Sequence, residues 1–118
     1  MSDRLTHECG LAFVRLRKPL HYYQEVYGDA AWGLRKTYLL MQKQYNRGQD
    51  GAGLGVVKFD MPAGDQFLLR IRSDKHNAIE RIFDEITEDT GQLREPVTSE
   101  TEMDAKRQCR FLGETYLG

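Results

Sequence analysis

The chain has only two cysteines, and its cysteines and histidines form no pattern of metal ligands. The two cysteines, Cys9 and Cys109, lie at opposite ends of the sequence, and no Cys-x-x-Cys occurs. The histidines, His7, His21 and His76, are scattered and lack the spacing of a metal site. We therefore expect neither a disulfide framework nor a bound metal.

Long hydrophobic runs and an excess of charge of one sign are also missing. The apolar stretches are too short to cross a bilayer, and residues 1–8 lack the apolar centre of a secretory signal. The 17 basic and 18 acidic residues are interspersed and leave a net charge of −1, so no basic surface for nucleic acid is predicted. These absences predict one small cytoplasmic domain with neither a membrane nor a nucleic-acid partner.

Two short segments stand out in what is present. Cys9-Gly10 leads into an apolar run, and residues 46–53 read Asn-Arg-Gly-Gln-Asp-Gly-Ala-Gly. If residues 1–8 were removed, Cys9 would carry a thiol and a free α-amine. An α-amine has a pKa of about 8, so it can act as general base for its own side chain near neutral pH. Cys9 is thus the candidate nucleophile, and the Glu8–Cys9 bond is the candidate cleavage site.

Together these segments resemble the class II glutamine amidotransferases, whose glutaminase domain is an N-terminal-nucleophile hydrolase opening with Cys-Gly. The second segment is close to the Arg-Gly-Gln-Asp-Gly-Ala-Gly form of the amidophosphoribosyltransferases, which catalyse the first step of purine synthesis. Sugar-phosphate aminating relatives typically carry Tyr-Asp-Ser after the Arg-Gly, and asparagine synthetases carry Pro-Asp. The resemblance covers about residues 8–60.

The resemblance implies an α+β fold of the layered αββα N-terminal-nucleophile hydrolase type, present here incompletely. Residues 1–8 would be a propeptide, and residues 9–118 the N-terminal part of the glutaminase domain. Cys9 would release ammonia from glutamine, while Arg47 and Gly48 would support the pocket behind it. The ammonia would then displace pyrophosphate from phosphoribosyl pyrophosphate in a second domain.

The resemblance also implies what the rest of the enzyme would hold. Mg²⁺ and, in some members, an iron–sulfur cluster would lie outside this chain, which itself would bind no cofactor. The parent enzyme would be a homo-oligomer in the cytoplasm.

Several residues that the family uses have no counterpart in this sequence. Members bind the glutamine carboxylate with an arginine from a Gly-His-x-Arg-Tyr type segment, form the oxyanion hole with an Asn-Gly pair, and bind the substrate amine with a later aspartate. This sequence has no Asn-Gly and no His-x-Arg. Because one lost oxyanion donor already costs on the order of 3 kcal/mol, we expect these 118 residues to be an inactive, poorly stable N-terminal fragment.

Alternative interpretations remain open. A cysteine before an apolar strand can be a small buried hydrophobe, and a glycine-rich segment can be an ordinary turn between helix and strand. The parent could instead be a glutaminase of the sugar-phosphate aminotransferase type. The chain could also be a non-catalytic interaction module of the same fold, or an incomplete and marginally folded piece.

Hydrophobic periodicity predicts the order of the elements. We expect strands at 9–16, 54–60, 66–72 and near 111–117, and helices at 30–45, 75–88 and 102–108. Residues 17–28 should form a loop or short helix, and residues 88–102 a long exposed loop. Asp29 should cap the first long helix, Trp32 should lie in the core, and Cys109 should be partly buried. Apolar side chains define the inner face of the helix at 75–88, at Ile79, Ile82, Phe83 and Ile86.

Overall fold

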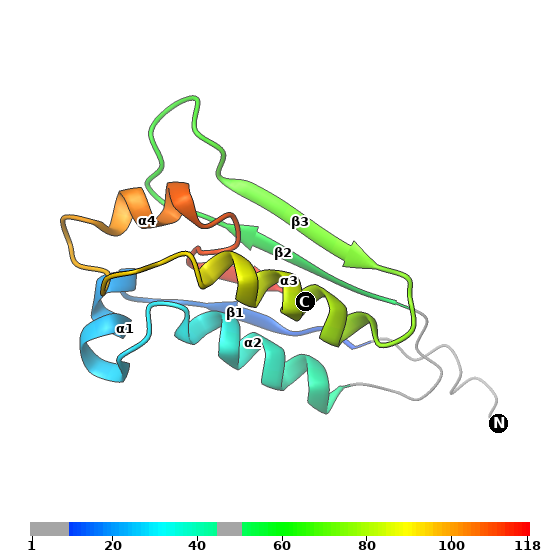
Figure 1. Ribbon diagram of the computed structural model, residues 1–118. Coiled ribbons are helices and arrows are strands. Elements are labelled where there is room, and N and C mark those ends of the chain that lie inside the picture. The colour runs from blue at the N-terminus through cyan, green and yellow to red at the C-terminus, as the bar shows by residue number, and fades with distance from the viewer. Residues whose placement is uncertain (1–9, 45–50) are drawn as a thin grey trace, which may run out of the picture.

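An antiparallel sheet organises the chain (Figure 1). The computed structural model describes residues 10–44 and 51–118. Within these ranges one four-stranded sheet has the order β1-β4-β2-β3. The strands are β1 (Phe13–Arg15), β2 (Ala52–Val57), β3 (Leu68–Ser73) and β4 (Thr115–Leu117). The last strand therefore lies in the middle of the sheet, between β1 and β2.

Helices occupy the connections between these strands. The described residues form α1 (Leu20–Tyr27), α2 (Trp32–Lys43), α3 (Ala78–Thr90) and α4 (Glu102–Gln108). Figure 1 shows α2 and α3 running along the sheet, with α1 and α4 toward one end. The expected α+β class is confirmed. None of the helices in the described ranges is long and apolar enough to cross a membrane.

The strand register gives the sheet two different faces. One cross-strand row joins Val14, Tyr116, Val56 and Leu69, and the last three of these are buried. The adjacent row joins Phe13, Leu117, Gly55 and Arg70. Because successive residues of a strand point to opposite faces, this second row faces away from the helices. The core therefore lies between the sheet and helices α2 and α3.

A glycine allows α2 to approach the sheet closely. A Cβ atom on Gly33 would lie 2.8 Å from Cε2 of Tyr116, which is closer than side-chain atoms can pack. The ring of Tyr116 is fully enclosed, and its hydroxyl donates a hydrogen bond to the carbonyl of Gly113 while accepting one from the Gly113 N–H. Helix α2 and the central strand β4 are therefore in close contact at Gly33 and Tyr116.

The two long helices largely match their predictions. The four apolar residues of α3 named above are all buried, as their spacing predicts. In α2, Leu34 and Met41 are buried, and the ring of Tyr38 lies 4.7 Å from the ring of Phe83. Asp29 accepts a hydrogen bond from the Ala31 N–H, so it stabilises the turn before α2 although the helix begins at Trp32.

Other expectations were wrong in detail. The first strand is shorter than residues 9–16, and β2 and β3 are displaced by about two residues from the expected ranges. Residues 88–102 are not simply exposed, because Val97 is buried and its N–H donates to the Gln24 side chain of α1. Leu93 of the same segment also packs against the core, and composition alone does not reveal such contacts. Trp32 is only partly buried, and its ring centroid lies 5.2 Å from that of Tyr23 and 4.9 Å from that of Tyr27.

Charged side chains are buried where α4 meets the sheet. The Lys106 ammonium donates to Oε2 of Glu114 at 2.8 Å and to the Phe59 carbonyl at 2.6 Å, and both side chains are almost fully buried. The other Glu114 oxygen accepts the Phe59 N–H. The Lys58 ammonium donates to the carbonyls of Lys106 and Cys109, and burial lowers the pKa of Lys58. Every charge in this network has a hydrogen-bonding partner.

We predict that Lys106→Met destabilises the protein by about 3 kcal/mol, because it leaves the Glu114 carboxylate buried without its cation. Urea unfolding followed by circular dichroism would measure the loss. The matched control is Arg107→Met at the next position, whose guanidinium pairs with Asp65 at the surface and should matter little. The double variant Lys106→Met/Glu114→Gln should recover part of the stability. Equal losses in Lys106→Met and in the control Arg107→Met would contradict the prediction.

Candidate functional site

The predicted site residues Glu8, Cys9, Arg47 and Gly48 lie outside the described residues, but their neighbours in sequence are described. Gly10 follows Cys9. Gln44 precedes, and Gly51 follows, the segment 45–50 that contains Arg47 and Gly48. The positions of these neighbours show how closely the described chain beside the two motifs approaches.

The neighbours converge. A Cβ atom on Gly10 would lie 2.6 Å from the Cβ of Gln44, so Gly10 is in direct contact with the end of α2. Leu11 and Gly51 line the same hollow on the sheet. Gly10 therefore contacts the residue before 45–50, and Leu11 shares one hollow with the residue after it, although these segments are far apart in sequence.

This hollow, which we call the glycine hollow, has a volume of about 860 Å³ and lies on the face of the sheet that the helices leave open. Its floor is the backbone of Gly51 and of β2 around Gly53 and Gly55. One wall is apolar and comes from Leu11 and Leu117. The opposite wall is mostly polar and comes from β3 and the residue after it, with Leu68, Arg70, Arg72, Ser73 and Asp74.

The space for a side chain differs among the three glycines of the floor. A Cβ atom on Gly51 would lie 2.9 Å from the carbonyl oxygen of Ser73, so this position cannot hold a side chain without moving β3. Around Gly53 and Gly55 the nearest atoms are at 3.5 Å or more. At these two positions the absent side chains instead leave the strand backbone open to a ligand.

The charge of the glycine hollow is mainly positive. Arg70 and Arg72 are exposed, and neither belongs to an ion pair with any described residue. Asp74 is the acid that lines the hollow. The alternation Leu-Leu-Arg-Ile-Arg-Ser places both arginines on one face of β3, so this feature could have been found from the sequence but was missed.

No nucleophile with an adjacent base occurs among the described residues that line the hollow. The hydroxyl oxygen of Ser73 accepts the backbone N–H of Lys75 at 3.2 Å, and no histidine lines this space. The described walls can therefore bind and orient a molecule. Covalent chemistry there would have to come from a residue outside them, and Cys9, two positions before Leu11, is the candidate.

The second cysteine has the properties of a structural thiol. Cys109 is fully buried rather than partly buried as expected. Burial, with a smaller contribution from Asp89, raises the pKa of its thiol to about 11. The nucleophilic thiolate is therefore rare at neutral pH, and Cys109 is a poor candidate for catalysis.

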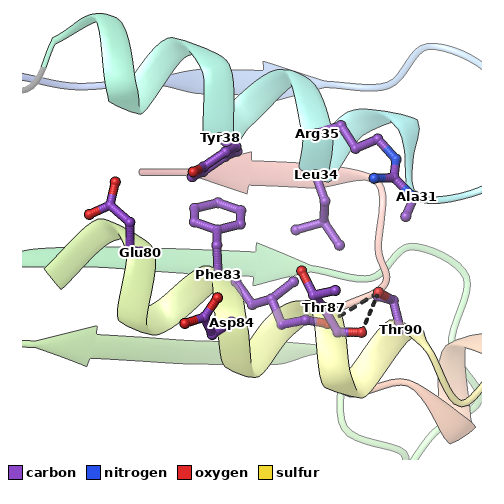
Figure 2. Close-up of a pocket in the computed structure, with 10 residues that line it drawn as sticks. Ala31, Leu34, Arg35, Tyr38, Glu80, Phe83, Asp84, Thr87 and Thr90 are labelled. Carbon is purple, nitrogen blue, oxygen red and sulfur yellow. Dashed lines mark hydrogen bonds between the residues drawn. The ribbon is translucent and has the colours of Figure 1, made fainter. Parts of the chain in front are cut away.

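A smaller hollow of about 230 Å³ separates α2 from α3 on the helix side (Figure 2). Leu34 and Phe83 project into it from the two helices, and Glu80 and Asp84 lie along its α3 side. Its polar groups are partly engaged, since Arg35 pairs with Asp29 and the Thr90 hydroxyl donates to the Ile86 carbonyl at 3.1 Å. We interpret this space as the gap left where two helices pack against each other.

The described part of the chain holds no group of three or more histidine, cysteine or acidic side chains arranged for a metal ion. Of the described histidines, His21 pairs with Glu102 at 2.8 Å. The candidate site is thus the glycine hollow with the two arginines of β3.

We predict opposite effects for two neighbouring glycines. Gly51→Ala should destabilise the protein by about 1–3 kcal/mol, because the new methyl group overlaps the Ser73 carbonyl. Gly53→Ala should be neutral or slightly stabilising, because there is space for a methyl group and the unfolded chain loses freedom. Thermal unfolding of both variants is the measurement, and an equal loss in both would show that the contact with β3 is not the cause.

The chain was compared with protein-family models, with curated proteins and with solved structures, and none of them matched it.

Proposed function

We propose that this chain is the glutamine-hydrolysing part of a class II amidotransferase, closest to the amidophosphoribosyltransferases, with Cys9 as the nucleophile. The observation that supports the proposal best is the convergence described above. Gly10 contacts Gln44, and Leu11 and Gly51 line one open hollow. Two motifs that suggest the family only in combination thus have their flanking residues at one place.

In the proposed reaction the Cys9 thiolate attacks the amide carbonyl carbon of glutamine. The α-amine of Cys9 takes the thiol proton and returns it to the leaving nitrogen, so the C–N bond breaks and ammonia departs. Water then hydrolyses the thioester to glutamate and regenerates the thiol. In the parent enzyme the ammonia would displace pyrophosphate from phosphoribosyl pyrophosphate.

The open face of the sheet supports the layered αββα arrangement that this proposal carries. Leu11, Phe13 and Leu117 point away from the helices and are 74%, 61% and 49% exposed. An apolar sheet face of this kind is typical of a sheet that packs against a second one. The helices on the other face would then form the outer layer.

The same open face also favours a second candidate function, a non-catalytic interaction module of the same fold. Such a module would use the apolar face to bind another chain and would need no thiol at position 9. The two candidates differ in what Cys9 does, and this difference can be measured in protein expressed from the complete reading frame.

We expect Cys9, and not Cys109, to be alkylated by the glutamine analogue diazo-oxo-norleucine, as detected by peptide mass spectrometry. Cys9→Ser should abolish glutamate release from glutamine but leave synthesis from free ammonia. The matched control is Cys109→Ser, which removes a buried thiol of raised pKa and should leave the labelling of Cys9 intact. A protein in which Cys9 stays unlabelled and Cys9→Ser changes nothing would be an interaction module.

We also expect cleavage between Glu8 and Cys9, because only a terminal cysteine has the free amine that the proposed mechanism uses. The intact mass of the active protein should lack Met1–Glu8. Glu8→Pro, which alters the residue before the cut, tests whether loss of processing and loss of activity go together. Active protein that retains these eight residues would refute the amine as general base.

A further inference from the structure

The helices α2 and α3 carry opposite charges. Helix α2 contains no acid, and its charged residues are Arg35, Lys36 and Lys43. Helix α3 contains one arginine among five acids, and its charged residues are Glu80, Arg81, Asp84, Glu85, Glu88 and Asp89. The two helices lie side by side on one face of the sheet, where the rings of Tyr38 and Phe83 are 4.7 Å apart (Figure 1). The helix side of the molecule is therefore divided into a basic half and an acidic half.

The basic half also exposes apolar side chains. One side of α2 is formed by residues spaced i, i+3, i+4 and i+7, namely Lys36, Leu39, Leu40 and Lys43, and we call these four the basic face. Leu39 is 49% exposed and Leu40 is 39% exposed, whereas Met41 beside them is buried. The Lys36 ammonium lies 5.4 Å from the centre of the Trp32 ring, one turn earlier. Exposed apolar groups that lie together between polar ones are typical of interaction surfaces.

The acidic half presents a row of carboxylates. Glu80, Asp84 and Glu88 are spaced i, i+4 and i+8, and all three are exposed on the side of α3 opposite its buried residues. We call these three the acidic face. Like charges at i and i+4 of a helix repel each other, so this row destabilises the isolated helix. Cations placed along the row would remove that repulsion.

The two faces do not pair with each other inside one chain. No ion pair within residues 10–44 and 51–118 joins α2 to α3, and none involves a charge of either face. On its α2 side, the space between the helices is lined by residues outside the basic face, namely Ala31, Leu34, Arg35 and Tyr38. The basic face therefore lies on another side of α2 and leaves its lysines available to a partner.

We propose that the basic face of one chain binds the acidic face of a second copy of this chain, and the reverse, in a symmetric dimer. A two-fold axis forms both contacts at once, because every copy carries both faces. In this dimer Lys36 and Lys43 pair with carboxylates of the second copy, and Leu39 and Leu40 are covered. The presence of both complementary faces on one molecule favours a second copy over an unrelated acidic partner.

The dimer contact is independent of the proposed hydrolase. It lies on the helix side of the sheet, whereas the glycine hollow lies on the side that the helices leave open. Helices of 12 and 13 residues form a small contact surface, so the dimer should be weak and depend on protein concentration. Added salt should weaken it further, because exposed charges are screened.

An exchange of charge between two variants tests this contact. Lys36→Glu/Lys43→Glu makes both faces acidic, and Glu80→Lys/Asp84→Lys makes both faces basic, so neither variant should dimerise with itself. Protein from the complete reading frame would be used, one variant with a heavy isotope label, and the pairs in the mixture would be counted by native mass spectrometry. We expect nearly all dimers to be mixed pairs, whereas unmodified heavy and light protein should give about half, the statistical share for equal amounts.

Matched controls separate this contact from a general effect of charge. Arg17→Glu/Arg94→Glu reverses two exposed arginines in loops, neither of them in an ion pair with a described residue, and should leave the Kd of the dimer unchanged. Leu39→Ser should raise that Kd about tenfold, because it removes apolar surface from the contact. Circular dichroism would verify that each variant is folded, which we expect because every substituted side chain is exposed.

Three results would overturn the proposal. They are unmodified protein that stays monomeric at its highest soluble concentration, statistical pairing of the two charge variants, and equal effects of Arg17→Glu/Arg94→Glu and Lys36→Glu/Lys43→Glu on the Kd. Statistical pairing would mean that any dimer forms through another surface. Labelling of Cys9 is measured separately, so the hydrolase and the dimer can each fail while the other stands.

Discussion

The fold depends on the insertion of β4 between β1 and β2. Tyr116 pairs with Val14 on one side and with Val56 on the other, so neither β1 nor β2 has its inner neighbour until the last strand is in place. These pairings join residues from the two ends of the described chain, which makes their formation costly in chain entropy. The sheet, its core face and its open face all depend on this insertion of β4.

Two features hold β4 in this position. The enclosed ring of Tyr116 packs against Gly33 of α2, and its hydroxyl is hydrogen-bonded to Gly113. The buried pair of Lys106 and Glu114 joins α4 to the start of β4. A buried ion pair adds little net stability compared with apolar packing, but its hydrogen bonds to Phe59 specify one position for the strand.

The insertion of β4 also gives the sheet two different sides. The helix side is filled with apolar side chains, and its hollow between α2 and α3 is a seam with partly engaged polar groups. The other side leaves Leu11, Leu117, Arg70 and Arg72 exposed and the glycine floor half-buried, and neither arginine is in an ion pair with a residue of 10–44 or 51–118. A ligand site and a surface for a further layer of structure can both exist on this side, because the helices leave it uncovered.

Local patterns in the sequence predicted much of the fold. The spacing of Ile79, Ile82, Phe83 and Ile86 predicted α3 and its buried face, because helical periodicity is a property of neighbouring residues. The short helix at 102–108 was predicted with its observed bounds. The Cys9 hypothesis likewise depends on short motifs that the sequence displays directly.

Other features depend on contacts between distant residues. The central place of β4, the anchoring of Val97 and the full burial of Cys109 are decided by which segments meet, and no local pattern encodes that. Alternation along β3 put Arg70 and Arg72 on one face, but only the register opposite Gly55 and Gly53 gave them open space. By itself, therefore, the sequence determined the helices, the approximate strands and the candidate nucleophile. Tertiary structure decided the strand order and the hollow, because both arise from pairing between residues far apart in the chain.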